Sequence, residues 1–333
     1  MIRAGSDILG DRSRVAGVTR VAAIDCGTNT IRLLVADLEG GQAREVVRTG
    51  LITRLGQGVD RTGELDADAL TRTLSATREF AGIIESEGAQ QVRFVATSAT
   101  RDARNRDEFV LGVREALGVE PEVVSGVVEA GLSFTGAVSA VSRAHPGPYL
   151  VVDLGGGSTE VVLGTDAPEY AVSLDIGSVR LHERHLVSDP PTQAEIDAAT
   201  VDVREALRRA EAEVPLHETA TLVGVAGTIT TTTAHALRLP GYQRERIDGA
   251  ELPVGIAMAA AQDLLAATRR ERAALPYLHP GRVDVIGAGA LIWFEVIARV
   301  LAETTAAGSG IRHVVTSEHD ILDGIALSLG ASA

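Results

Sequence analysis

The chain has 333 residues, contains arginine but no lysine, and carries a formal net charge of −14. The lack of lysine excludes a Walker-type phosphate lysine, a Schiff base and a Ser–Lys pair, and the acidic balance argues against a nucleic-acid partner. No apolar run reaches the roughly 18 residues of a membrane span, and the first 17 residues lack the apolar centre of an export signal. We therefore expect a cytoplasmic protein with no membrane partner.

The length exceeds that of one ordinary core and predicts two domains. Apolar periodicity alternates between strand and helix spacing along the chain, which indicates mixed α/β domains. Strands are predicted near 21–25, 31–37, 44–49, 92–96, 123–124, 150–153, 159–163, 170–174, 222–225 and 283–286. Helices are predicted near 67–87, 105–117, 128–142, 192–213, 229–237, 254–267, 288–302 and 320–329.

Residues 1–18 show no strand pattern, so we expect a flexible tail there, or none if Val18 is the true first residue. The first domain is then expected over 19–128 and the second over 129–333. The C-terminal helix of the second domain could return to the first. The single cysteine, Cys26, cannot form an internal disulfide and is expected to be a small buried filler.

Two stretches repeat one pattern, AAIDCGTNTIRLLVAD from Ala22 and LVVDLGGGSTEVVLG from Leu150. In each, an apolar run leads through an Asp (Asp25, Asp153) into a turn of small residues, and a second apolar run follows. This predicts a β-hairpin twice. Amides of such turns can bind phosphate oxygens, and an Asp at the strand end can hold a divalent cation.

A third small-residue turn follows the strand pattern that begins at Leu222, in LVGVAGTITTTTAHAL, where Gly227 and Thr228 open a Thr-rich helix. His182 and His185 could pair as metal ligands one helical turn apart, but a surface helix is the favoured interpretation because no third ligand is evident. His279 to Arg282 is predicted to be a turn that enters a strand.

Glu129 opens a helix that follows a predicted strand, at the expected boundary between the domains. A carboxylate there could orient and deprotonate a water molecule, or it could only stabilise the helix dipole. The residue pattern alone favours the dipole and leaves both roles open.

Further motifs occur in order: FVATSATRDARN from Phe94, VSGVVEAGLSFTG from Val124, RVDVIGAGAL from Arg282 and a tail from Thr316 to Leu329. With the two hairpins they resemble the exopolyphosphatase / guanosine pentaphosphate phosphohydrolase family over about 19–329. The resemblance implies an α/β fold of two actin-like, ribonuclease H-like domains with a cleft between them.

The resemblance also implies roles for individual residues. Glu129 matches the second Glu of the family's Glu-Glu-Ala-Arg-Leu motif, which is the catalytic base. Asp25 and Asp153 are expected to position Mg²⁺, with Glu160 supporting the ion through its water shell. Phosphate binding is expected from Gly27, Thr28, Asn29, Thr30, Arg32, Ser98, Arg101, Gly155, Gly156, Gly157, Ser158, Thr159, Gly227 and Thr228.

Three positions depart from the family pattern: Val128 replaces the first Glu, Gly131 replaces the Arg, and Thr30 replaces the usual Ser. The loss of the arginine is expected to affect affinity or preferred chain length rather than the reaction. Because the core's last helix ends near Leu329 and no helical extension follows, we expect a preference for short polyphosphate, with phosphate released one at a time.

The sequence thus predicts a Mg²⁺-dependent exopolyphosphatase, expected to be a homodimer, that removes terminal phosphate from inorganic polyphosphate. A close alternative keeps the chemistry and takes guanosine pentaphosphate as substrate. Two different classes of protein also stay open, an actin-like ATPase or kinase and a non-catalytic polyanion sensor.

Overall fold

A computed structural model describes residues 17–330. The tail predicted for 1–18 therefore lies, except for Gly17 and Val18, outside the described residues. Within 17–330 no helix is both long and apolar enough to cross a lipid bilayer.

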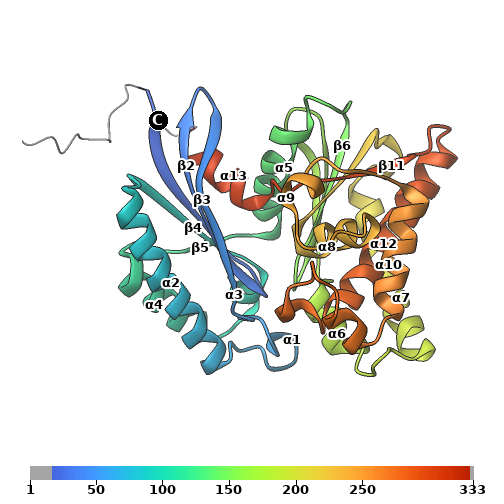
Figure 1. The fold of residues 1–333 in the computed structure, drawn as a ribbon, viewed down its shortest axis with the longest axis horizontal. Coiled ribbons are helices and arrows are strands. Elements are labelled where there is room, and N and C mark those ends of the chain that lie inside the picture. Colours follow the sequence, from blue (N-terminus) through green and yellow to red (C-terminus); the bar gives the residue numbers. More distant parts are fainter. Residues whose placement is uncertain (1–16, 331–333) are drawn as a thin grey trace, which may run out of the picture.

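Two mixed sheets form the body of the protein (Figure 1). The first has the order β3-β2-β1-β4-β5, with bounds Thr19–Cys26 (β1), Thr30–Glu39 (β2), Gln42–Ile52 (β3), Gln91–Ala96 (β4) and Glu122–Val123 (β5). The second has the order β10-β11-β9-β6-β7-β8, with bounds Tyr149–Leu154 (β6), Thr159–Gly164 (β7), Pro168–Leu174 (β8), Thr221–Val225 (β9), Glu251–Pro253 (β10) and His313–Thr316 (β11).

The two sheets share one topology. β8-β7-β6-β9-β11 of the second sheet has the same sequence order as β3-β2-β1-β4-β5 of the first, with antiparallel pairs on one side and parallel pairs on the other. The repeat predicted from the hairpins is thus a repeat of the whole sheet. This duplicated arrangement agrees with the predicted α/β fold of two related domains.

Helices cover both faces of each sheet, and the central strands β1 and β6 are therefore buried on both sides. On the first sheet, α2 (Ala67–Glu87) and α4 (Arg106–Leu117) cover the outer face and α13 (Ile321–Gly330) the inner face. On the second, α7 (Gln193–Glu213) and α12 (Ile286–Ala306) lie outside and α5 (Gly126–Val141) inside. Figure 1 shows α5 and α13 side by side between the sheets.

Side-chain caps mark several helix starts. Asp66 accepts hydrogen bonds from Asp68 N and Ala69 N at the start of α2, and Ser125 accepts one from Val128 N at the start of α5. The other helical segments are α1 (Val59–Thr62), α3 (Ser98–Asp102), α6 (Ser178–His185), α8 (Ala226–Ala236), α9 (Arg244–Ile247), α10 (Val254–Ala266), α11 (Arg269–Ala273) and two 3₁₀ turns, Leu216–Glu218 and Pro280–Arg282.

One predicted strand is wrong. Residues 283–286 do not enter a sheet: the turn at His279–Arg282 continues as a 3₁₀ segment, and α12 begins at Ile286. The apolar run there was too short to distinguish a strand from the start of a buried helix. The strands β10 and β11, which pair with each other, were not predicted.

Candidate functional site

Both hairpin turns are built in the same way. The Gly27 amide donates to the Thr30 carbonyl at 3.0 Å, and the Gly155 amide donates to the Ser158 carbonyl at 3.0 Å. The strand register places Asp25 opposite Arg32 in the first hairpin and Asp153 opposite Glu160 in the second. The halves therefore share geometry but differ in charge: one Asp faces a cation and the other a carboxylate.

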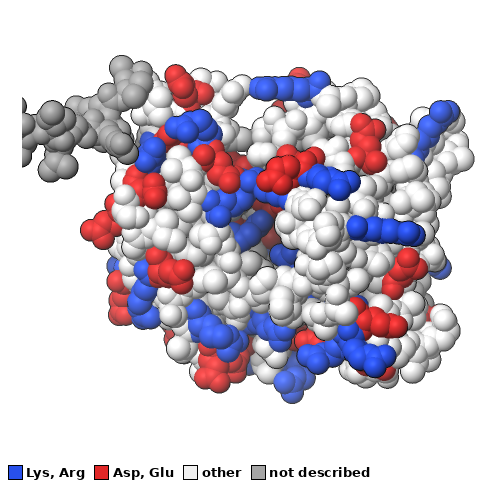
Figure 2. Space-filling view, viewed as in Figure 1, with Lys and Arg blue, Asp and Glu red and all other residues white. Residues whose placement is uncertain are grey.

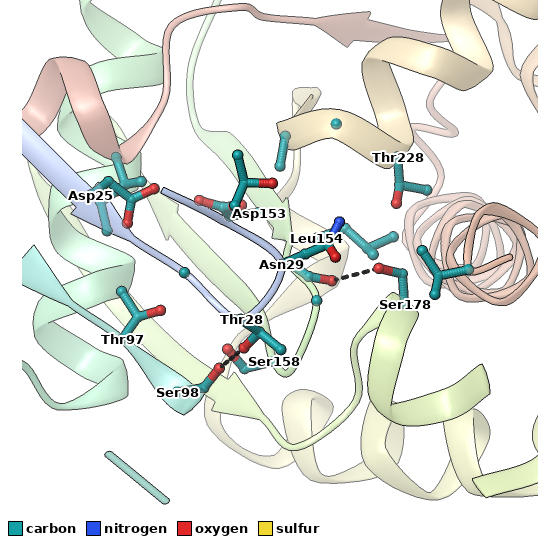
Figure 3. A pocket seen from close by; sticks show the side chains of 18 of the residues that line it. Asp25, Thr28, Asn29, Thr97, Ser98, Asp153, Leu154, Ser158, Ser178 and Thr228 are labelled. Carbon is teal, nitrogen blue, oxygen red and sulfur yellow. Dashed lines mark hydrogen bonds between the residues drawn. The ribbon is translucent and has the colours of Figure 1, made fainter. Parts of the chain in front are cut away.

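The two turns line a common pocket between the sheets, with a volume of about 100 Å³ (Figure 3). Figure 2 shows the surface hollowed between the two halves, with arginine and carboxylate side chains around the hollow. The predicted residues that line the pocket are Asp25, Gly27, Thr28, Asn29, Thr30, Arg32, Ser98, Glu129, Asp153, Gly155, Gly156, Ser158, Gly227 and Thr228.

The two turns approach each other closely. Thr28 Oγ1 and Ser98 Oγ are hydrogen-bonded at 2.8 Å, and Figure 3 shows this pair beside the second turn. A Cβ on Gly157 would lie 2.6 Å from each of these oxygens. Only glycine fits there, so Gly157 serves the approach of the turns, although it does not line the pocket.

Four carboxyl groups gather here, all nearly excluded from solvent: Asp25, Glu129, Asp153 and Glu160. Burial, with the negative charges of Asp153 and Asp25, raises the pKa of Glu129 to about 8. Burial, with the charges of Asp320 and Asp25, raises the pKa of Asp153 to about 7. The pKa of Glu160 is raised well above its usual range, by burial and by repulsion from Glu129 and Asp153.

Such a cluster favours a divalent cation. Mg²⁺ takes one or two protein carboxylates and fills its other positions with water and substrate phosphate, so a closed cage of protein ligands is not required. Among residues 17–330 no group of three or more His, Cys, Asp or Glu side chains forms such a cage. Asp153 is suited to bind such a cation because its carboxylate lines the pocket. Among the described residues, no cationic side chain lies within hydrogen-bonding distance of it.

The two predicted arginines behave differently. Arg32 lines the pocket and binds Asp25 through Nε at 3.1 Å and Nη2 at 2.7 Å, while its Nη1 pairs with Asp320. Arg101 does not line the pocket. Its Nη1 donates to Glu129 Oε2 at 3.1 Å and to the Val124 carbonyl at 3.1 Å.

Two more of the predicted residues do not line the pocket. Thr159 Oγ1 donates to the Ile176 carbonyl at 2.7 Å, and Glu160 accepts from Ser173 Oγ at 2.7 Å behind the second turn. Of the two histidines on α6, His185 bonds Asp202 at 3.0 Å, as a surface helix would allow.

The polar and charged pocket residues that the sequence did not indicate are Thr97, Ser178 and Arg282. Arg282 approaches from the turn before α12, and its Nη1 donates to the Gly227 carbonyl at 3.4 Å. In the sequence, Arg282 is a basic residue that directly follows a His-Pro-Gly turn. Because a strand was predicted to begin at 283, Arg282 was not considered as a pocket residue.

Comparison with known proteins agrees with this geometry. The pattern of the Ppx/GppA phosphatase family matches residues 34–322. The chain belongs to the Ppx/GppA family. Exopolyphosphatase 2 of Mycobacterium tuberculosis is 48% identical over 321 residues, which cover 94% of this chain and 99% of that protein.

Solved structures of Ppx/GppA proteins share the whole architecture. An exopolyphosphatase-like protein superposes with a TM-score of 0.92 at 47% identity, covering 95% of this chain and 98% of that one. An exopolyphosphatase from Cytophaga hutchinsonii gives a TM-score of 0.82 at 25% identity, covering 95% and 99%. A family member from Aquifex aeolicus gives 0.77 at 28% identity, covering 95% and 98%.

Proposed function

We propose that this protein is an exopolyphosphatase, a phosphoanhydride hydrolase that releases terminal orthophosphate from inorganic polyphosphate with Mg²⁺. The observation that carries the proposal is the pair of equivalent turns, which face one pocket together with a buried carboxylate, Glu129. Membership of the family and 48% identity to a relative named Exopolyphosphatase 2 support the same reaction.

In the proposed reaction Glu129 is the general base. A water oxygen attacks the terminal phosphorus, its proton passes to Glu129, and the bond from that phosphorus to the bridging oxygen breaks. The shortened chain leaves with the bridging oxygen. Burial raises the proton affinity of Glu129, so its ionised form is a stronger base toward this proton than an ordinary carboxylate.

The turns would bind the phosphate oxygens. Backbone amides of Gly27–Thr30 and Gly155–Ser158 can donate to them, and Arg32 and Arg282 bring positive charge to the pocket. A bound Mg²⁺, held by Asp153 with Asp25 and Glu160 nearby, would neutralise phosphate charge.

A second, larger hollow of about 590 Å³ adjoins the pocket and shares Thr30, Arg32, Gly227 and Arg282 with it. Arg48 and Arg244 also line it, but both pair with Glu45, and Glu318 and Asp320 line it as well, so the hollow offers little positive charge to the distal phosphates of a long chain. Short polyphosphate is therefore the proposed substrate. The same hollow contains the exposed Tyr242, whose ring could stack on a base, so guanosine pentaphosphate is the second candidate.

The test is orthophosphate release from short polyphosphate, long polyphosphate, guanosine pentaphosphate and ATP, each measured with Mg²⁺ and with excess chelator. We expect Mg²⁺-dependent release that is fastest with short polyphosphate. Faster release from guanosine pentaphosphate would select the second candidate, and release from none of the four would contradict the proposal.

A further inference from the structure

One hydroxyl on helix α5 does not follow the usual behaviour of hydroxyls on helices. Thr135 Oγ1 and Ser139 Oγ bond back to carbonyls of their own helix, those of Gly131 at 2.9 Å and Gly136 at 2.7 Å, as Ser and Thr in helices commonly do. Ser133 Oγ instead donates to Asp153 Oδ2 at 2.6 Å. This bond joins α5 to the end of β6.

The site of this bond is fully enclosed. Ser133 has no exposed surface and Asp153 is 7% exposed. A hydrogen bond from a neutral hydroxyl to a buried carboxylate is short and strong, and water cannot replace it. One oxygen of Asp153 is therefore held by Ser133, and the other is left for the pocket that Asp153 lines.

Ser133 also lies one helical turn after Glu129, on the same face of α5. The helix thus places Glu129 and the hydroxyl that holds Asp153 at a fixed spacing. A shift of α5 would move Glu129 and the hydroxyl that holds Asp153 together.

We propose that Ser133 is a positioning residue, which fixes the orientation of Asp153 for the divalent cation and keeps it in register with Glu129. The inference rests on the proposed function in that Asp153 is taken as the cation's carboxylate. Ser133 itself touches neither the substrate nor the cation.

The test is Mg²⁺ binding to the substrate-free protein by titration calorimetry, for wild type, Ser133→Ala and Ser139→Ala. Loss of a group that orients a metal ligand weakens metal affinity by roughly 10- to 100-fold, and we expect this for Ser133→Ala. Ser139→Ala removes a hydroxyl from the same helix away from Asp153 and should bind Mg²⁺ as wild type does. The Mg²⁺ concentration that gives half-maximal turnover should rise in parallel for Ser133→Ala.

Ser133→Cys distinguishes the loss of the hydrogen bond from the loss of side-chain volume, because a thiol is similar in size to a hydroxyl but is a weak hydrogen-bond donor. We expect it to lose Mg²⁺ affinity as the Ala variant does, with melting temperatures of all variants close to that of wild type. Unchanged Mg²⁺ affinity in Ser133→Ala, or no measurable binding by wild type, would overturn the inference. If wild type releases no phosphate, but Ser133→Ala still binds Mg²⁺ more weakly than wild type does, the inference about Ser133 stands. That result would contradict only the proposed function.

Discussion

At the scale of single residues, the contact between Arg101 and Glu129 changes the role expected for Arg101. The sequence motif suggested that Arg101 binds phosphate, whereas the structure pairs it with Glu129 at 3.1 Å, outside the pocket lining. Burial raises the pKa of Glu129 to about 8, and the positive charge of Arg101 acts against that rise. Arg101 therefore favours the ionised form of Glu129, which is the form a base requires.

A pH profile of kcat/KM measures this balance, because it reports the pKa of groups in the free enzyme. Glu129 must be ionised to accept a proton, so kcat/KM should rise with pH; the pKa of Glu129 is about 8 without a cation, and bound Mg²⁺ favours the carboxylate, so the rise should be complete by about pH 8. Arg101→Ala removes the charge that lowers the pKa, and the rise should move to higher pH. The measurement is orthophosphate release from polyphosphate between pH 5 and about 10, with subsaturating substrate and saturating Mg²⁺.

Arg104→Ala is the matched control. Arg104 lies three residues further on and pairs with Glu64 on the exposed surface, so its pH profile should match that of wild type. An Arg101→Ala variant with an unchanged profile and only a raised KM would show that Arg101 binds substrate instead.

At the scale of elements, the close crossing of α5 and α13 sets the geometry of the site. A Cβ on Gly136 would lie 1.9 Å from the Asp320 carbonyl oxygen, and one on Gly324 would lie 1.9 Å from that of Leu132. The two helices therefore touch backbone to backbone. Since α5 carries Glu129 and α13 begins beside Asp320, which pairs with Arg32, this crossing holds the two sides of the pocket together.

Gly136→Ala should therefore destabilise the protein by about 1–3 kcal/mol, the usual cost of overpacking. Gly82→Ala is the control: Gly82 lies on the exposed side of α2, where an added Cβ would have nothing within 4 Å, so Ala should stabilise by about 0.5–1 kcal/mol. Thermal unfolding of both variants checks the pair. Equal stability of Gly136→Ala and wild type would contradict the close crossing.

Most elements could be predicted because their apolar residues follow the strand or helix spacing over many consecutive residues. The helix predicted over 67–87 is α2, and both hairpins lie where the repeated motifs placed them. The exceptions were short segments whose structure depends on distant partners. β11 is four residues long and exists through pairing with β9 and β10, and Arg282 reaches the pocket only because the 3₁₀ turn before α12 directs it there. Contacts between residues far apart in the chain cannot be predicted from the local sequence.

At the scale of the whole molecule, ion pairs join the two halves on either side of the pocket. Asp60 in the first half pairs with Arg184 at 2.7 Å and Arg180 at 3.1 Å in the second. Glu45 on β3 pairs with Arg244 at 2.8 Å. These contacts bridge the two halves, and none of the pairings could be read from a sequence in which arginines and carboxylates are spread throughout.

We propose that polyphosphate is hydrolysed in this pocket with Glu129 as the base. The most direct test compares orthophosphate release from polyphosphate by wild type and Glu129→Gln, with Mg²⁺ present. Gln keeps the size and polarity of the side chain but cannot accept the proton, so turnover should fall by a factor of about 10² or more, while the melting temperature stays close to that of wild type. Release by Glu129→Gln at the wild-type rate would contradict the role of Glu129 as the base.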